Sequence, residues 1–138
     1  MLRSCMGLGL AALLTLAAAA PTQGMSVAAK SMKGKWRGTL SQKMTPPFTV
    51  TVDIRSFDRF EGRNPVKYGA PLNCTGHWRY TGAEGNVYRF KETITGGKSD
   101  TCKGTGRIRI TWTDDDRLQY RFTGGGVTST GTLRPVED

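Results

Sequence analysis

The sequence has 138 residues, the size of one domain, and carries 20 Lys and Arg residues against 11 Asp and Glu residues, a formal net charge of +9. A basic surplus of this size steers a protein toward anionic surfaces and away from basic partners. The single His and three Cys residues leave few groups for metal or nucleophilic chemistry.

The first 24 residues have the layout of a secretory signal peptide. Arg3 gives a positively charged start, and an uncharged apolar run over Met6–Ala20 follows. The run is too short and too poor in flanking charge for a spanning helix, and the alternative is a buried amphipathic N-terminal helix. We expect cleavage after Gly24 or Ala29, because both sites have small or short residues at the last and third-last positions.

Export sets the predicted organisation and location. We expect a signal peptide (1–24), a flexible lead-in (25–35) and a single domain (36–138), with no transmembrane segment once the signal is removed. The mature chain would be secreted or periplasmic, and it keeps its basic surplus because Arg3 is the only charged residue lost.

From residue 36 onward, apolar and polar residues alternate with period two and no helical repeat appears, which predicts strands. In the clearest strand, 48–54, apolar residues at even positions alternate with polar residues at odd positions. Pro46 and Pro47 mark the turn before it, and Pro65 makes the next strand an edge or irregular one. In chain order we expect strands at 36–42, 48–54, 60–68, 72–80, 87–95, 102–112, 118–122 and 127–133.

About eight strands joined mostly by short turns predict an all-β fold. We expect an antiparallel up-and-down barrel of lipocalin or avidin type, because closure removes exposed sheet edges; the alternative is a β-sandwich. A barrel of about eight strands has an interior that side chains just fill, or that holds one small ligand.

Cys74 and Cys102 are the two cysteines of the mature chain, and an oxidising compartment favours a disulfide between them. Both have inward parity, and each begins a strand running in the same direction, so both lie at one end of the sheet. A bridge at the rim is feasible there. The alternative, a reactive or metal-binding pair of Cys74 and His77, is disfavoured because a spacing of three puts the two side chains on opposite faces of a strand.

Other candidate chemistry is weak. We expect His77 to face the solvent, and no zinc site, because three or four ligands are needed. The acidic run Asp114, Asp115 and Asp116 lacks the alternate spacing of a calcium loop and predicts a solvated turn. No helix follows the glycine-rich turns to bind phosphate. We therefore expect no metal, no cofactor and no catalytic residue, so the protein is predicted not to be an enzyme.

Glu92 is the one charged residue with inward parity in the middle of a predicted strand. A buried carboxylate is costly unless it is paired or hydrogen-bonded. Glu92 is therefore either a ligand anchor in a cavity, or a structural group near the barrel mouth or beside an arginine of a neighbouring strand. Aromatic side chains of the same parity are the other candidate contacts to an interior ligand: Trp36, Trp78, Tyr88, Trp112 and Tyr120.

Cations gather at positions of outward parity. Since neighbouring strands lie about 4.8 Å apart, they could form one basic band; the alternative is an ordinary solvated face. A functional band would bind an anionic polymer or membrane surface, whereas nucleic acid is disfavoured by export and by the lack of outward aromatic residues. The basic band comprises Arg79, Arg89, Lys91, Arg107, Arg109 and Arg121.

The segments 68–80, 88–102 and 106–122 resemble small exported β-domains of bacteria, some of them attached outside the membrane to serine/threonine kinases. The shared order is a tyrosine-containing turn before the first cysteine, an acidic-x-Ile-Thr segment with glycine before the second, and a closing aromatic hairpin. The resemblance implies this fold and disulfide, and in the kinase-linked cases a sensor. The matching residues are Tyr68, Cys74, Glu92, Ile94, Thr95, Cys102, Leu118 and Tyr120.

Gly34, Lys35 and Trp36 are similar to the Gly-x-Trp start of lipocalin-like barrels. That resemblance implies that Trp36 closes one barrel end and stacks on a late-strand arginine, here Arg121 or Arg134.

These patterns predict an exported, monomeric, disulfide-linked barrel that binds and does not catalyse. The leading hypothesis is a binding module for an anionic envelope component, such as a glycan or lipid surface, or for a small amphiphilic ligand. The alternative is a secreted protein inhibitor of a hydrolase or other partner enzyme, with basic lysozymes disfavoured by the positive charge.

Overall fold

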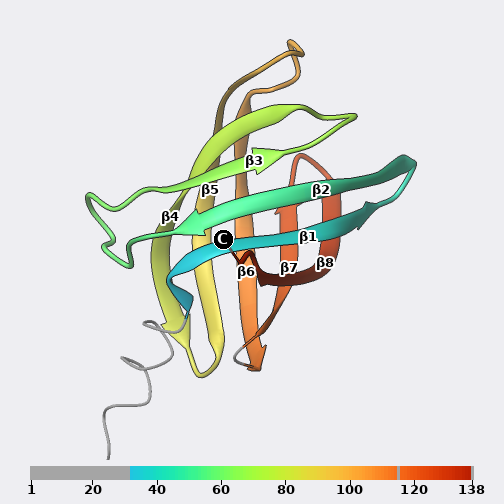
Figure 1. The fold of residues 1–138 in the computed structure, drawn as a ribbon. Helices are drawn as coiled ribbons and strands as arrows, with labels where there is room; N and C mark the ends of the chain where they lie inside the picture. The colour runs from blue at the N-terminus through green and yellow to red at the C-terminus, as the bar shows by residue number, and fades with distance from the viewer. Residues whose placement is uncertain (1–31, 115, 138) are drawn as a thin grey trace, which may run out of the picture.

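The computed structural model describes residues 32–114 and 116–137; the predicted signal peptide and both cleavage sites lie outside them. In this part of the chain eight antiparallel strands close into an up-and-down barrel (Figure 1). The predicted barrel is therefore confirmed. The strands are β1 (Gly34–Gln42), β2 (Thr45–Ile54), β3 (Asn64–Tyr68), β4 (Cys74–Glu84), β5 (Val87–Gly97), β6 (Gly104–Asp114), β7 (Arg117–Gly124) and β8 (Val127–Pro135).

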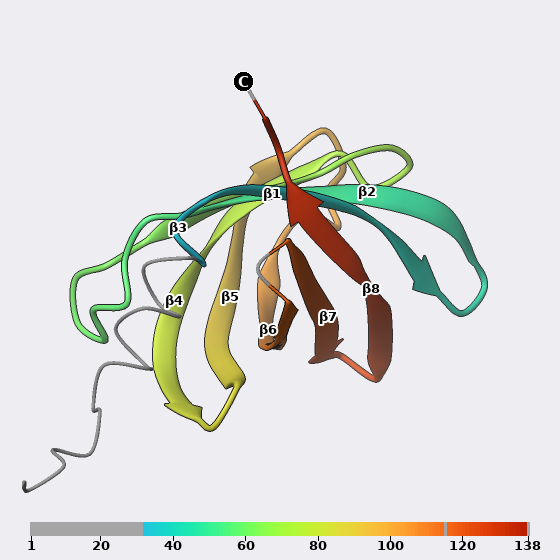
Figure 2. The same cartoon turned by 60° about the horizontal axis from the view of Figure 1, so that its bottom comes forward.

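Closure depends on the pairing of the first strand with the last. β1 and β8 pair continuously from Trp36 opposite Pro135 to Gln42 opposite Ser129. Every other strand pairs with its neighbours in sequence, and Figure 2 shows β4, β5, β6 and β7 side by side as one curved wall. The β1–β2, β3–β4, β5–β6 and β7–β8 connections share one end of the barrel, and the other connections share the opposite end.

Each strand differs from its predicted range by one to four residues at one end or at both. Pro46 and Pro47, predicted to mark a turn, lie inside β2, and Cys102, predicted to begin a strand, lies before β6. β1 begins at Gly34, before the predicted Trp36, and β3 begins at Asn64 instead of Phe60. The period-two pattern continues through Phe60, but that side chain is 89% exposed and belongs to the β2–β3 loop. The pattern was misleading because an apolar residue at the right parity need not face the core.

The period-two alternation separates a dry interior from a charged exterior. Trp78 and Ile108 are 0% and 1% exposed, whereas Arg79 and Arg107 beside them are exposed. The core is aromatic and aliphatic, and its buried members are Met32, Trp36, Leu40, Phe48, Val50, Val52, Ile54, Val66, Tyr68, Trp78, Tyr88, Phe90, Ile108, Ile110, Leu118, Tyr120 and Leu133.

A glycine on β6 makes room for an aromatic side chain inside the barrel. A Cβ atom built on Gly106 would lie 2.0 Å from Cε2 of Phe122. Any larger residue would therefore displace the ring. Because Gly106 pairs with Glu92 of β5, this ring occupies the space next to the Glu92 strand position.

The predicted disulfide joins Cys74 and Cys102, whose Cα atoms are 5.2 Å apart. It links the start of β4 to the loop before β6 and so spans the end of β5. Gly97, which pairs with Cys74, has a φ of 148°, and a Cβ atom there would lie 2.5 Å from Sγ of Cys102. Glycine is therefore required beside the bridge.

Removing the bridge by the double substitution Cys74→Ser/Cys102→Ser should lower the free energy of unfolding by about 3.5 kcal/mol, because a cross-link across a sequence separation of 28 restricts the unfolded chain. Urea denaturation of the oxidised parent and of the variant measures this difference. Cys74 and Cys102 should also show no reactive thiol in the native parent before reduction. Two titratable thiols in the native protein, or equal stability of the two forms, would contradict the linkage.

Candidate functional site

A hydrogen-bonded network surrounds Glu92, the one buried acidic side chain among residues 32–114 and 116–137. Glu92, 3% exposed, accepts hydrogen bonds at Oε1 from the hydroxyl of Tyr68 and from Nε1 of Trp78, the latter at 3.0 Å. The hydroxyl of Tyr120 lies 2.8 Å from that of Tyr68 and donates to it, because the Tyr68 proton is directed at Glu92. Strands β3, β4, β5 and β7 thus contribute one side chain each.

Burial controls the protonation of this network. It raises the pKa of Glu92, and the hydrogen bonds from Tyr68 and Trp78 oppose the shift only in part. The pKa of Tyr68 and that of Tyr120 are also raised, chiefly by burial and also by the nearby acidic groups. The predicted arginine partner of Glu92 is replaced by tyrosine and tryptophan, since Glu92 has no ion pair among the described residues.

The interior aromatic candidates do not line one space. Trp78 and Tyr120 pack together, with ring centroids 5.9 Å apart, and join the Glu92 network. Tyr88 packs against Phe57, with 5.9 Å between ring centroids, and contacts that network through Phe57 and Phe90. The side chains that fill the barrel are therefore packed against one another.

The other two tryptophans lie apart from that network. Trp36 is buried and donates from Nε1 to the carbonyl oxygen of Met32 at 2.8 Å. The arginines that the lipocalin resemblance assigned to it, Arg121 and Arg134, are both exposed. Trp112 is half-buried, and its Nε1 has no hydrogen-bond partner in the described part of the chain.

The basic band forms two rows on the outer wall made by β4–β7. Arg109 lies directly opposite Arg89 on one side and Arg121 on the other. Lys91 lies directly opposite Arg79 and Arg107 in the second row. All six side chains are exposed. Like charges directly opposite each other on adjacent strands destabilise a sheet, so this arrangement works against the stability of the free protein.

The two rows border a hollow of about 870 Å³ on the outer face. No carboxylate lines it. Glu84 is within 4.0 Å of Arg89, but its side chain is 86% exposed, and such surface pairs contribute little. The side chains with a hydrogen-bond donor that line the hollow are Thr81, Arg89, Lys91, Thr105, Arg107, Arg109, Arg121 and Thr123.

The outer positions next to the band on β5, β6 and β7 are uncharged. Thr93 pairs with Thr105 beyond one row, and Thr111 pairs with Gln119 beyond the other. On β8, Thr130 lies opposite Arg121. An ordinary solvated face intersperses both signs of charge, whereas this wall concentrates cations in the middle of a threonine-rich surface.

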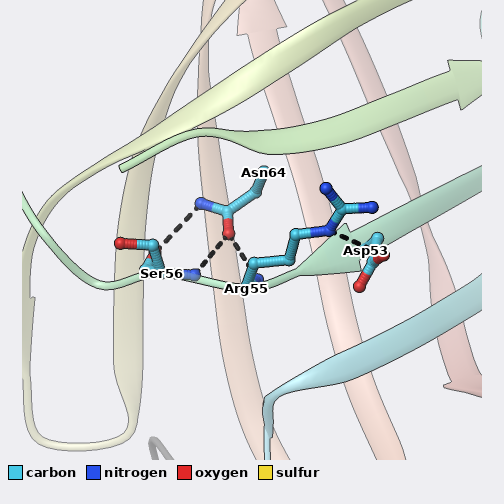
Figure 3. Close-up of polar contacts among 4 residues, drawn as sticks. All are labelled: Asp53, Arg55, Ser56 and Asn64. Carbon is cyan, nitrogen blue, oxygen red and sulfur yellow. Dashed lines mark hydrogen bonds and ion pairs between the residues drawn. The ribbon is translucent and has the colours of Figure 1, made fainter. Parts of the chain in front are cut away.

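The β2–β3 loop is fixed by one buried amide that the sequence pattern did not single out (Figure 3). Asn64 is 0% exposed, and its Oδ1 accepts from the backbone N–H groups of Arg55 at 2.6 Å and Ser56 at 2.9 Å. Its Nδ2 donates to the carbonyl oxygens of Ser56 at 3.1 Å and Trp78 at 3.0 Å. All the polar capacity of the buried amide is used, so the loop is held against β4.

This loop brings two further arginines to the β4 side of the basic band. Nη1 of Arg63 lies 2.6 Å from Nε2 of His77, which accepts because a guanidinium can only donate. Nη2 of Arg59 lies 3.4 Å from where a Cβ of Gly82 would be, and Gly82 is opposite Arg89. His77 is half-buried at an outward position of β4.

Neither a metal cluster nor a membrane-spanning helix is found in residues 32–114 and 116–137. No group of three or more His, Cys, Asp or Glu side chains there could hold a metal ion. No helix in the same residues is long and apolar enough to cross a bilayer.

No protein-family model and no curated protein matches the sequence. Among solved structures, the chain is similar to a redesigned β-barrel, mFAP1, bound to DFHBI, with a TM-score of 0.58 and 17% identity over 78% of this chain and 97% of that one. It is also similar to a redesigned β-barrel, b11L5F_LGL, with a TM-score of 0.62 and 16% identity over 80% of this chain and 96% of that one. These similarities support the barrel alone, and the resemblance to kinase-attached domains stays a prediction.

Glu92→Gln should fold and should flatten the pH dependence of stability. Because burial raises the native pKa of Glu92 above 4.5, the native state binds more protons than the unfolded chain at and above that pH. The parent should therefore lose stability as the pH rises through this window, and the amide, which still accepts from Tyr68 and Trp78, should not. Urea midpoints across pH measure this.

The exposed Glu84→Gln variant serves as the control for Glu92→Gln and should keep the pH profile of the parent. A Glu92→Gln profile with the same slope as the parent would show that the buried carboxyl does not titrate as inferred.

Arg63→Gln should raise the pKa of His77. Burial, Arg63 and Arg79 together lower that pKa below 6.5, and the substitution removes one of the two cations. Since the unfolded chain holds the proton more tightly, the parent loses stability as the pH falls through this range, and the variant should lose less. NMR titration of the single histidine gives the pKa directly, with Arg55→Gln as the control because Arg55 pairs with Asp53. An unchanged or lower value in Arg63→Gln would contradict the contact.

Proposed function

We propose that the protein is an exported, non-catalytic binding module that holds an anionic component of the cell envelope on its basic band. The observation that carries this proposal is the outer hollow, which five cations line and no carboxylate does. A site with only positive charge attracts anions from solution and repels basic partners.

The energetics of the band support a bound anion. The directly opposed cations of β5, β6 and β7 repel one another in the free protein, and an anion bound between two opposed cations reduces that repulsion. Binding is therefore favoured both by the new contacts to the anion and by weaker electrostatic repulsion between the opposed cations.

A ligand site inside the barrel is less well supported than the outer wall. The designed barrel mFAP1 was solved with DFHBI, so a barrel of similar fold can hold a small ligand. In this chain, however, Trp78, Tyr88 and Tyr120 are at most 3% exposed and pack within the core. The outer wall is accordingly the better candidate than an interior amphiphile site.

The double variant Arg107→Gln/Arg109→Gln should bind the envelope fraction of the producing cell on the order of 10- to 100-fold more weakly than the parent, because two charge-assisted contacts are lost. Co-sedimentation measures the binding. Raising the ionic strength from about 0.05 M to about 0.5 M should weaken binding by the parent as the charges are screened. The variant should be at least as stable as the parent, since it carries fewer opposed cations.

A matched control removes two cations from β1. Lys35→Gln/Arg37→Gln changes the net charge equally and should bind nearly as the parent does. Equal losses in both double variants would reduce the proposal to a general charge effect. Salt-independent capture of one stoichiometric enzyme would instead favour the inhibitor alternative.

A further inference from the structure

The composition of the basic band restricts the anion it fits. Five of its six members are arginine, the exception being Lys91. Guanidinium presents its N–H groups as a planar fork that meets two oxygens of one anion, whereas an ammonium group acts as a point charge. A diffuse attraction to negative charge would be served equally by lysine, so the arginines point to a defined oxyanion.

The register of the band adds a second restriction. Arg109 has Arg89 directly across one strand gap and Arg121 directly across the other. Because neighbouring strands lie about 4.8 Å apart, the guanidinium groups of two paired arginines can reach the same anion. Such an anion must accept hydrogen bonds from two forks together.

A carboxylate is a poor match for this geometry. Its two oxygens can accept from more than one arginine, but its single charge balances only one cation and it has no third oxygen. A phosphomonoester has three terminal oxygens and a charge of about −1.5 to −2 at neutral pH, so it can bind one fork with two oxygens and reach the second fork with the third. Two phosphomonoesters would together bring a charge of about −3 to −4 to the five cations that line the hollow, whereas two carboxylates would bring about −2.

The surroundings of the hollow favour a polymer over a bilayer. The large apolar side chains that are exposed in the described residues are Met44, Phe60 and Val127. They lie in the β1–β2 turn, in the β2–β3 loop and at the start of β8, and none belongs to the wall formed by β4–β7. The wall thus presents cations and threonines with no apolar anchor for insertion among acyl chains, and its concave site suits a chain laid along it.

We propose that the basic band binds phosphomonoester groups carried on a glycan of the cell envelope. This inference rests on the proposed function and specifies its ligand chemistry. The phosphate groups bind between the paired arginines of one row, which donate hydrogen bonds to them: Arg89, Arg109 and Arg121. Lys91 and Arg107 of the other row line the same hollow and add positive charge.

The test compares three named probes by titration against the same protein. The first two are dextran phosphate and carboxymethyl dextran of equal length and charge density, and the third is a vesicle that contains phosphatidic acid. We expect dextran phosphate to bind at least about 10-fold more tightly than carboxymethyl dextran, because each of its groups offers a third oxygen and a larger charge to the paired arginines. Vesicles of equal phosphate content should bind more weakly than dextran phosphate.

A charge-conserving variant separates recognition from attraction. Arg89→Lys/Arg109→Lys/Arg121→Lys keeps every charge but removes the forks, so its preference for phosphate over carboxylate should fall to about 2-fold or less while its affinity for carboxymethyl dextran stays within about 2-fold. Arg37→Lys on β1 is the control and should keep the full preference.

The outcomes distinguish the two proposals. Equal affinity of the parent for both dextrans, or an undiminished preference in the lysine variant, overturns the phosphomonoester inference and leaves binding to the envelope fraction standing. Tighter binding to vesicles than to dextran phosphate overturns the assignment to a glycan. If the parent protein does not bind the envelope fraction at all, both the proposed function and this inference are wrong.

Discussion

Closure of the sheet by the pairing of β1 with β8 is the constraint on which the rest of the structure depends. Once the sheet is closed, inward positions have no alternative to the core and outward positions have none to the solvent. The same strand register therefore places the aromatic side chains in the barrel interior and the cations in rows on its outer wall. A slip of one residue in β6 would bury Arg107 and Arg109 and expose Ile108, which no small barrel could tolerate.

The Glu92 network and the basic band lie in environments of different dielectric constant. Around Glu92 a low-dielectric environment favours a neutral carboxyl, and tyrosine and tryptophan donors satisfy it without any cation. On the outer wall, water screens each cation, which lets opposed arginines coexist at a moderate loss of stability. The interior network thus holds strands together, whereas the exterior rows keep their hydrogen-bonding capacity for a partner.

Local alternation was enough to predict the strands and the basic band, because both follow from parity along single strands. The barrel was predicted from the number of strands and the need to remove exposed edges, and the disulfide from the two cysteines that remain after the signal peptide. Parity does not predict where a residue lies along the barrel axis relative to residues of the neighbouring strands. Tyr68 and Trp78 reach Glu92 only because of the relative stagger of β3, β4 and β5, so an arginine partner was predicted instead. The contact of Arg63 with His77 was missed for a related reason: it depends on how Asn64 folds the β2–β3 loop onto β4.

The most direct test of this account is the cross-strand register of β5, β6 and β7 in solution. Nuclear Overhauser contacts should place the backbone of Arg109 opposite both Arg89 and Arg121, with Arg107 opposite Lys91. That result would put the cations in rows on one wall. Contacts that pair Arg109 with Phe90 or Tyr120 would mean a shifted register, and both the dry interior and the anion site would then be wrong.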